Sequence, residues 1–389
     1  MKNPTWLKLT LLLTAMMTMM AGAVVAPSLP QINEVFRNVP KADLLTRLVI
    51  TLPALTMAIF SPIYGKLIDT YGRKPWLVVA LIIYAISGTS GYYLNDIYLI
   101  LIGRALLGVA VAGIMTICTT LVGDYFAGAE RAKFLGIQGA FIGLGGVVFI
   151  TIAGILADIK WQAPFLIYLF SLPVLLLVVK LIYEPKIIIE NKITEGKSET
   201  LKNNNKLILI IYLTVFFIVV CFYMAPVQIP YMLMALEGVN NTMVGIAISV
   251  STLTSAILSM NYKRIKGALS FTRIYMYAFL LMGIGYFFVS RSSEYWHFIV
   301  ALAINGTGVG LFMPTGALWI MEISPAHLRG RLMGGASTAM FLGIFFSPII
   351  VQPLINSVGY YATFFTAAVF LILGAVVYLL LGRIVLKNH

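Results

Sequence analysis

Charged residues are scarce in this sequence, and acidic residues are the scarcest. Of the 389 residues, 60% are hydrophobic and 11% are charged, with 14 Asp and Glu against 27 Lys and Arg for a formal charge of +13. So few charges cannot cover a surface that faces water, so most of the chain is expected to lie in lipid. This composition excludes secreted and disordered proteins, and the placement of the basic residues, described below, excludes nucleic-acid binding.

Cysteine and histidine are also nearly absent. Cys118 and Cys221 lie inside apolar runs, and His297, His327 and His389 are scattered along the chain. Neither a disulfide scaffold nor a metal site is expected. The sequence has no Gly-x-x-x-x-Gly-Lys-Ser/Thr loop, so we expect no use of ATP and no cofactor.

What the sequence does contain is a series of long apolar runs. A helix that crosses the roughly 30 Å hydrocarbon layer needs about 20 mostly apolar residues, and we predict twelve such helices. Their ranges are Leu9–Pro30, Leu44–Pro62, Trp76–Tyr93, Ile97–Val122, Phe134–Leu156, Ala163–Tyr183, Leu207–Tyr231, Met243–Asn261, Ile274–Val289, Tyr295–Met321, Leu332–Ile355 and Tyr360–Leu381.

The basic residues set the orientation of these spans. If the N-terminus is cytoplasmic, 21 of the 27 Lys and Arg fall in cytoplasmic segments. The rest are Arg37, Lys41, Arg47, Lys160 and Arg291 on the outside and Arg104 within a span. Because basic loops stay on the cytoplasmic side, we predict a multi-pass protein of the cell membrane, in bacteria the inner membrane, with both termini in the cytoplasm.

The first apolar run admits a second interpretation. Lys2 and Lys8 precede it and small residues follow at 21–23, as in a secretory signal peptide. The apolar core of a signal peptide is about 7–15 residues long. This run is longer and has a counterpart in the second half of the chain, so we interpret it as a membrane span.

The chain repeats itself at an offset of 198 to 199 residues. Asp124 after the fourth span corresponds to Glu322 after the tenth, and Gly145 corresponds to Gly343. The fold expected is an all-α membrane protein with two six-helix halves, which many secondary transporters use to hold substrate between the halves at mid-depth. The predicted domains are residues 1–183, a cytoplasmic linker at 184–206, and residues 207–389.

The most specific motif lies between the second and third predicted spans. Residues 65–74 read Gly-Lys-Leu-Ile-Asp-Thr-Tyr-Gly-Arg-Lys. This Gly-x-Leu-x-Asp-x-x-Gly-Arg-Lys pattern resembles the signature loop of the major facilitator superfamily. The resemblance implies the fold of that superfamily. It also implies a cytoplasmic latch, in which Asp69 meets the start of the eleventh helix. We expect a close helix approach at the first Gly and a tight turn at the second. The implied latch residues are Gly65, Asp69, Gly72, Arg73, Lys74 and Asp124, with Arg329 and Arg331 close by.

Two charged positions are candidates for proton coupling or substrate binding. Arg104 lies seven residues into the fourth span, where a charge is costly unless it faces the bundle interior. Its Arg-x-x-x-Gly pattern resembles a superfamily motif linked to proton coupling, and the alternative is that the side chain reaches to the outer headgroups. Asp43 and Arg47, four residues apart, are expected to pair on one helix face as a structural clasp or a proton site.

Glycines and prolines mark where the predicted helices pack closely or bend. The candidates are Gly108, Gly113, Gly145, Gly146, Pro27, Pro30, Pro226 and Pro348. The Ala-Pro-x-x-Pro segment at 26–30 resembles the motif that ends the first helix of twelve-span drug–proton antiporters. The Gly-Pro dipeptide that those antiporters carry in the fifth helix is missing, which argues against antiport.

Apart from Arg104, the charged side chains stay near the ends of the predicted spans. The candidates for a cavity lining are therefore uncharged, and they are Met20, Gln138, Tyr223, Gln228, Asn305 and Trp319. An apolar, aromatic cavity rich in methionine fits amphiphilic drugs. Arg104 in a cavity poor in acids would instead suit an anionic metabolite or siderophore.

The sequence thus predicts a secondary active transporter rather than an enzyme, with proton-coupled efflux of amphiphilic drugs or other small molecules as the leading function. Export of a small anionic metabolite or siderophore is the alternative, and a multi-span membrane enzyme or receptor is the alternative from another class. The expected partners are a small-molecule substrate, a proton and the lipid bilayer, without nucleic acid. The expected state is a monomer.

Overall fold

The computed structural model describes residues 4–185, 201–324 and 328–385, and regular structure in these ranges is helical. The N-terminal helices are α1 (Pro4–Ala23), η1 (Ala26–Ser28), α2 (Leu29–Val35), α3 (Ala42–Tyr71), α4 (Lys74–Gly88), α5 (Ser90–Tyr93), α6 (Ile97–Tyr125), α7 (Gly128–Ile159), η2 (Ala163–Phe170) and α8 (Ser171–Leu181). The C-terminal helices are α9 (Leu201–Met234), α10 (Asn241–Met260), α11 (Tyr262–Ala268), α12 (Phe271–Val289), α13 (Tyr295–Ile323) and α14 (Arg329–Val385).

The all-α membrane fold and its predicted spans are confirmed. Eleven segments in the described ranges are long and apolar enough to cross a membrane, and the last of them extends over 54 residues from Arg329 to Gly382. Within α14, Gly359 has a positive φ of 82° that ends one helix and starts the next. This residue separates the eleventh and twelfth predicted spans.

One predicted boundary, the end of the second span, is wrong. The first membrane segment runs from Thr5 to Val35, with a break where α1 ends at Ala23 and a 3-10 turn containing Pro27 leads into α2. The second span continues beyond Pro62 as helix to Tyr71, so most of the signature segment is helical and the turn comes at Gly72. The helix α9 begins at Leu201, inside the predicted linker 184–206, of which residues 186–200 lie outside the described part.

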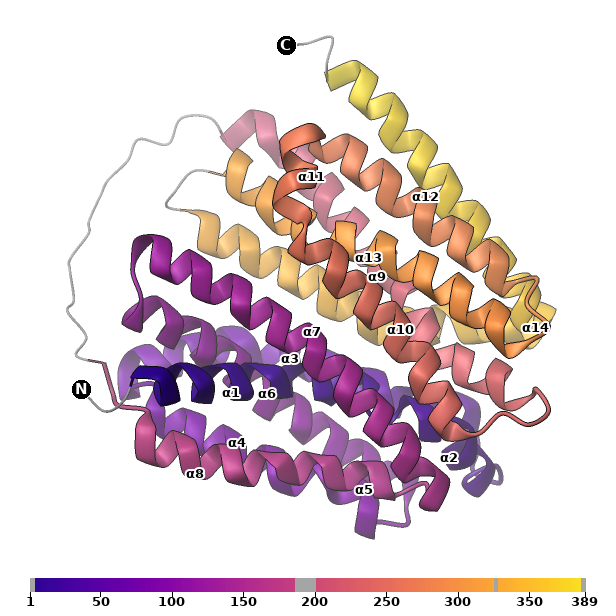
Figure 1. Ribbon diagram of the computed structural model, residues 1–389, viewed down its shortest axis with the longest axis horizontal. Coiled ribbons are helices and arrows are strands. Elements are labelled where there is room, and N and C mark those ends of the chain that lie inside the picture. Colours follow the sequence, from indigo (N-terminus) through magenta and orange to yellow (C-terminus); the bar gives the residue numbers. More distant parts are fainter. Residues whose placement is uncertain (1–3, 186–200, 325–327, 386–389) are drawn as a thin grey trace.

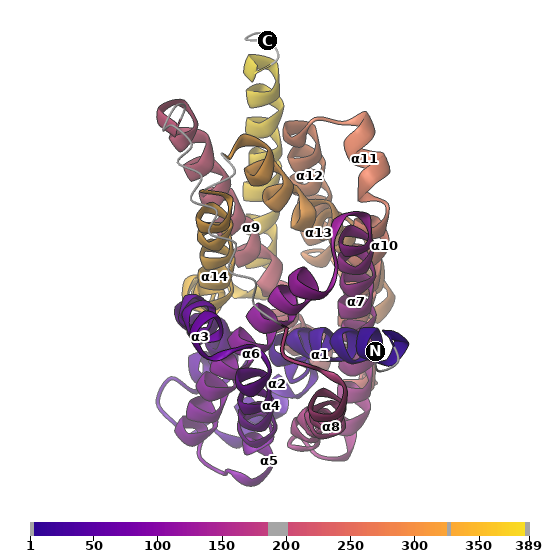
Figure 2. The ribbon, with the colours of Figure 1, turned by 90° about the vertical axis from the view of Figure 1, so that its left-hand side faces the viewer.

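The N-terminal and C-terminal helices lie side by side, as Figure 1 shows in indigo to magenta and in orange to yellow. Contacts between the two groups are concentrated in two helix pairs, α3 with α14 and α7 with α10. Viewed from the end that carries the N-terminus, α1 and α6 lie opposite α9 and α13 between these pairs (Figure 2). The end of the molecule that carries the N-terminus also contains Gly72 and Leu181, and we call it the linker end. The opposite end contains Asp43 and Tyr360, and we call it the distal end.

Candidate functional site

The distal end contains a buried arginine that joins the two groups of helices. Arg47 of α3 is 1% exposed. Its Nε donates to Oε1 of Gln228 in α9 over 2.8 Å, and its Nη2 donates to the Tyr360 hydroxyl in α14 over 2.9 Å. The guanidinium also lies 4.2 Å from the ring centroid of Tyr231, which adds a cation–π contact. We call Arg47, Gln228, Tyr231 and Tyr360 the distal cluster.

Asp43 pairs with Arg47, as the spacing predicted. Its carboxylate lies 3.7 Å from Nη1 of Arg47, which also donates to the Asp43 carbonyl oxygen. The Asp43 side chain is 59% exposed, whereas that of Arg47 is 1% exposed. The carboxylate therefore faces the surroundings of the protein at the distal end, and it neutralises part of the charge that the distal cluster buries.

A second link at the distal end involves Asp158, near the end of α7. Its Oδ1 accepts from the backbone and side-chain nitrogens of Asn241 over 2.8 and 3.0 Å, and its Oδ2 accepts from the backbone N–H of Thr242 over 3.1 Å. These N–H groups belong to the first turn of α10, where backbone donors have no partner within the helix and a negative charge is stabilised. The Asp158 carboxylate thus caps a helix of the other group, and we call this link the Asp158 cap.

Between these links the helices α7 and α10 pack backbone to backbone. A Cβ at Gly154 would lie 2.6 Å from the carbonyl oxygen of Asn241, and a Cβ at Gly245 would lie 2.8 Å from the carbonyl oxygen of Ile150. The Thr151 and Ser249 hydroxyls meet at 3.0 Å nearby. The two groups of helices are therefore in close contact from the middle of this pair to the distal end.

At the linker end the predicted latch residues form contacts within the N-terminal helices. Nε of Arg73 donates to Oδ2 of Asp124 over 3.0 Å, and Nη2 lies 3.8 Å from the carboxylate of Asp69. The Asp69 side chain is 74% exposed. Gly72 has a φ of 91°, which explains the glycine at this turn.

The acid at residue 184 completes this corner of the molecule. Glu184 accepts from the backbone N–H groups of Arg73 and Lys74 over 2.6 and 2.8 Å, and so caps the start of α4. Glu184 is not among the predicted site residues, although an acid directly after the sixth span could have suggested a helix cap. Lys74 donates from Nζ to the Val179 carbonyl oxygen over 2.8 Å.

The C-terminal latch candidates lie at the start of α14. Arg329 donates from Nε to the Ser324 carbonyl oxygen over 3.2 Å, within its own group of helices, and the Arg331 side chain is exposed. The close helix approach expected at Gly65 is absent in this conformation, because a Cβ there would meet nothing within 4 Å. The N-terminal latch residues thus contact residues of the N-terminal helices, and Arg329 contacts a residue of the C-terminal group.

Arg104 of α6 is completely buried, so its side chain does not extend to the headgroups. Its Nε donates to the carbonyl oxygen of Val49 over 2.8 Å, its Nη1 to the Tyr168 hydroxyl over 2.9 Å, and its Nη2 to the carbonyl oxygen of Ala21 over 2.6 Å. These partners lie on α3, η2 and α1. Arg104 therefore ties four N-terminal helices together through neutral acceptors.

The predicted packing glycines receive side chains or backbone of neighbouring helices. A Cβ at Gly108 would overlap the Pro53 carbonyl, and one at Gly113 would lie 2.7 Å from the Tyr64 ring. Gly145 and Gly146 lie against Met16 and Met19 of α1. The predicted prolines lie at different positions: Pro27 in η1, Pro30 in the first turn of α2, Pro226 inside α9 and Pro348 inside α14.

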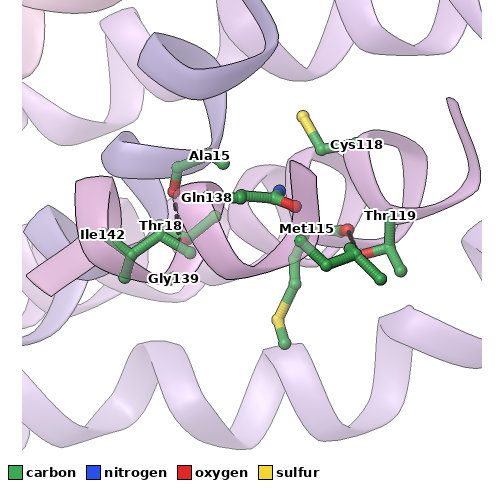
Figure 3. A pocket seen from close by; sticks show the side chains of 9 residues that line it. Ala15, Thr18, Met115, Cys118, Thr119, Gln138, Gly139 and Ile142 are labelled. Carbon is green, nitrogen blue, oxygen red and sulfur yellow. Dashed lines mark hydrogen bonds between the residues drawn. The ribbon is translucent and has the colours of Figure 1, made fainter. Parts of the chain in front are cut away.

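Gln138, one of the six predicted cavity residues, lines a pocket. Gln138 of α7 lies in a cavity of about 190 Å³ between α1, α6 and α7, together with Thr18, Met115 and Thr119 (Figure 3). We call this cavity the N pocket. Of the three helices that line it, α7 packs against α10 of the C-terminal group, and α1 and α6 lie opposite α9 and α13 (Figure 2).

The other five candidates pack against neighbouring helices, because the contacts within the bundle decide which face of each helix points inward. Met20 and Asn305 are fully buried, and the Gln228 oxygen is occupied by Arg47. Trp319 stacks on Phe271 at 5.4 Å between ring centroids. The Tyr223 hydroxyl lies against Gly22 of α1, where a Cβ would come within 2.7 Å of it. The sequence analysis also missed Tyr360 and Asp158, whose roles depend on contacts between distant segments.

Comparisons with known proteins agree on one family. The sequence model of the Major Facilitator Superfamily matches residues 11–237 and 211–388. The tetracycline resistance protein, class B, of Escherichia coli is 26% identical over 343 residues, which cover 84% of this chain and 82% of that protein. Multidrug resistance protein 1 of Bacillus subtilis is 25% identical over 323 residues, which cover 80% and 81%.

The fold is also similar to that of solved transporters. The crystal structure of a D-xylose-proton symporter superposes with a TM-score of 0.82 at 16% identity, and the match covers 96% of this chain and 97% of the symporter. At this identity the likeness concerns the fold alone.

Proposed function

The chain belongs to the major facilitator superfamily, so it is a multi-pass membrane transporter and not an enzyme, and we propose that it exports amphiphilic drugs or other small molecules in exchange for protons. The drug resistance proteins to which it is similar over most of its length support export. We place it in the cell membrane with the linker end and both termini in the cytoplasm, as the distribution of basic residues favours.

One observation carries this proposal, namely the difference between the two ends of the molecule. At the distal end, the distal cluster and the Asp158 cap join the N-terminal and C-terminal helices. At the linker end, Arg73 binds Asp124 within the N-terminal helices, and Arg329 binds Ser324 within the C-terminal helices. A transporter that is closed outside and unlatched inside can exchange substrate with the cytoplasm, which is the state in which an exporter would load.

The transport cycle then follows from exchanging one set of contacts for the other. We propose that the groups 1–183 and 207–389 rock about the substrate as two bodies. In the outward-facing state the Arg47 and Asp158 links separate, and Asp69 meets the start of α14 near Arg329 and Arg331. The substrate leaves on the outside, and the distal links form again as the protein returns to the inward-facing state in exchange for a proton.

Asp43 is our first candidate for a group through which protons affect this cycle. Its carboxylate is exposed at the distal end and lies 3.7 Å from the guanidinium of Arg47. A proton on Asp43 would remove the negative charge beside the buried arginine and so weaken the distal cluster. Arg104 remains the second candidate, acting through the positions of α1 and α3 rather than by contact with substrate.

The contacts of Arg104 also favour amphiphiles over anions as substrates. An exporter of carboxylates needs a cation that faces the cavity, and Arg104 is fully buried among neutral acceptors of its own group. The residues around the N pocket carry no formal charge. Export of an anionic metabolite or siderophore therefore loses the residue on which it depended.

Transport by inside-out vesicles tests the proposal. Vesicles from cells that express the protein should accumulate lipophilic drugs when their lumen is acidified, and collapse of the pH gradient should abolish the accumulation. Vesicles without the protein serve as the control. Accumulation that is unchanged by the pH gradient would remove the proton from the proposal, and absence of accumulation for every amphiphile tried would remove export.

A further inference from the structure

The C-terminal helices contain a second pocket that is the repeat counterpart of the N pocket. It has a volume of about 90 Å³ and lies between α9, α13 and α14. We call it the C pocket. Each pocket is lined by nine residues, and seven of the nine correspond one to one at an offset of 198. Examples are Met115 with Met313 and Ile142 with Met340.

This correspondence puts the two pockets at equivalent positions of the two halves. Two halves related by an axis along the membrane normal carry equivalent positions at the same depth, on opposite sides of the axis. The helices α6 and α13, which contribute to the pockets, lie on the two sides of the boundary between the groups (Figure 2). A substrate held between the groups therefore has one pocket on each side.

The two pockets differ in polarity. Gln138 in the N pocket corresponds to Ala336 in the C pocket, and Leu135 corresponds to Met333. The C pocket thus has three methionines, Met313, Met333 and Met340, which adapt to varied apolar shapes. Neither pocket is lined by a charged side chain among the residues that the structure describes.

The Gln138 amide is available for a ligand. The residue is 7% exposed, and its amide has no hydrogen-bond partner among the described residues. By contrast, the hydroxyls of Thr18 and Thr119 donate to carbonyl oxygens of their own helices over 2.7 and 2.9 Å. Figure 3 shows the Gln138 side chain extended toward Met115 and Cys118, with its amide between them. The amide offers both donors and an acceptor to a ligand in the pocket.

We propose that Gln138 selects uncharged amphiphiles that carry an amide, carbonyl or hydroxyl group at one end. The polar end binds the Gln138 amide in the N pocket, and the apolar part of the substrate packs against the methionines of the C pocket. This inference rests on the proposed export function and names its substrate class. It makes Gln138 a specificity residue, and Ala336 is its apolar counterpart.

Two probes of opposite chemistry test this assignment in inside-out vesicles. Chloramphenicol is uncharged and has an amide, two hydroxyls and an aromatic ring, whereas tetraphenylphosphonium is a lipophilic cation without a hydrogen-bonding group. Gln138→Leu keeps the size of the side chain but removes the amide. We expect it to lower the kcat/KM for chloramphenicol about three- to tenfold, the effect of one lost neutral hydrogen bond, and to leave that for tetraphenylphosphonium unchanged.

Two further variants separate selectivity from folding. Thr120→Val changes a residue of α6 that does not line the N pocket and whose hydroxyl already donates to the Thr116 carbonyl oxygen over 2.9 Å, so it should leave both probes unaffected. Gln138→Glu adds a negative charge to the N pocket and should raise the preference for tetraphenylphosphonium over chloramphenicol. Immunoblots normalise each rate to the amount of protein in the membrane.

The outcomes distinguish this inference from the function on which it rests. If the wild type transports neither probe, nor any other amphiphile, the export proposal fails. If the wild type transports tetraphenylphosphonium but not chloramphenicol, export stands and the selection of uncharged amphiphiles is overturned. An equal loss for both probes in Gln138→Leu, or no loss for either, overturns the role of Gln138.

Discussion

Arg47 and Gln228, which are 181 residues apart, are joined by a hydrogen bond of 2.8 Å from Nε of the arginine to Oε1 of the glutamine. The bond links α3 of the N-terminal helices to α9 of the C-terminal helices and is buried at both ends. A hydrogen bond to a charged group contributes about 1.5–3 kcal/mol. Opening the distal end must therefore break this hydrogen bond. Binding of substrate or a proton is needed to offset the free energy that is lost.

Replacement of Arg47 should open the distal end. In Arg47→Ala the bonds to Gln228 and Tyr360 are lost, and a tenfold shift in population needs only about 1.4 kcal/mol. We expect a Cys at the buried position Ser28 to react at least about tenfold faster with an impermeant maleimide added from outside. Cys118 and Cys221 are replaced by Ala in this background.

Arg37→Ala is the matched control for this experiment. Arg37 also lies at the distal end, but it is exposed and pairs with Glu34 of the same group of helices. Its loss should leave the labelling rate of the Ser28→Cys variant unchanged. Equal labelling of the Arg47→Ala and wild-type backgrounds would mean that the distal cluster does not hold the outer end closed.

Asp158→Ala and Asp96→Ala form a second matched pair. Each carboxylate caps a helix, but Asp158 caps α10 of the other group whereas Asp96 accepts from Tyr98 and Leu99 at the start of its own helix α6. Loss of a cap costs about 0.5–2 kcal/mol in either case, so both variants should lower the melting temperature in detergent. Only Asp158→Ala should speed labelling at position 28. Similar labelling in the two variants would show that the Asp158 cap is structural.

Replacement of Arg104 should damage the N-terminal helices. Arg104→Ala leaves the carbonyl oxygens of Val49 and Ala21 without a donor and creates a cavity, which together cost about 2–5 kcal/mol. We expect a lower melting temperature and at least about tenfold slower transport. Arg104→Lys keeps the charge but cannot reach three separated acceptors, so it should recover only part of both. Full transport by the alanine variant would make the arginine dispensable.

The latch hypothesis predicts that replacement of Asp69 lowers the transport rate without lowering the stability of the protein. The Asp69 side chain is 74% exposed in this structure, so Asp69→Asn should leave the melting temperature and membrane level unchanged. If Asp69 binds the start of α14 in the outward-facing state, the variant should still slow transport severalfold. Glu130→Gln is the control, because Glu130 is an exposed acid at the same end that pairs with Lys8 of its own group. Equal rates in the two variants would contradict the latch.

The sequence predicted the helices well because each helix depends on neighbouring residues. Twelve apolar runs and the offset of 198 to 199 residues are properties of local composition, and the break at Gly359 agrees with the division between the last two runs. The offset also indicated which positions of the two halves are equivalent. The same offset relates the N pocket to the C pocket.

The sequence could not predict which side of each helix faces the pathway. Met20 and Gln138 were equal candidates, yet Met20 is fully buried among N-terminal helices while Gln138 lines the N pocket. The rotation of a helix depends on its contacts with distant segments, and in a membrane apolar residues face both lipid and core. For the same reason the sequence places Arg47 on the outer side, paired with Asp43, but does not indicate that it is buried against Gln228 and Tyr360.

The measurement that tests proton-coupled export most directly is proton release from acidified inside-out vesicles. A pH-sensitive dye records the gradient while uncharged amphiphiles, lipophilic cations and carboxylate metabolites are added in turn, with Asp69→Asn vesicles as the control. We predict that amphiphiles dissipate the gradient in wild-type vesicles, that carboxylates do not, and that the variant responds more slowly. A response to the carboxylates alone would contradict drug export and return the assignment to an exporter of anionic metabolites.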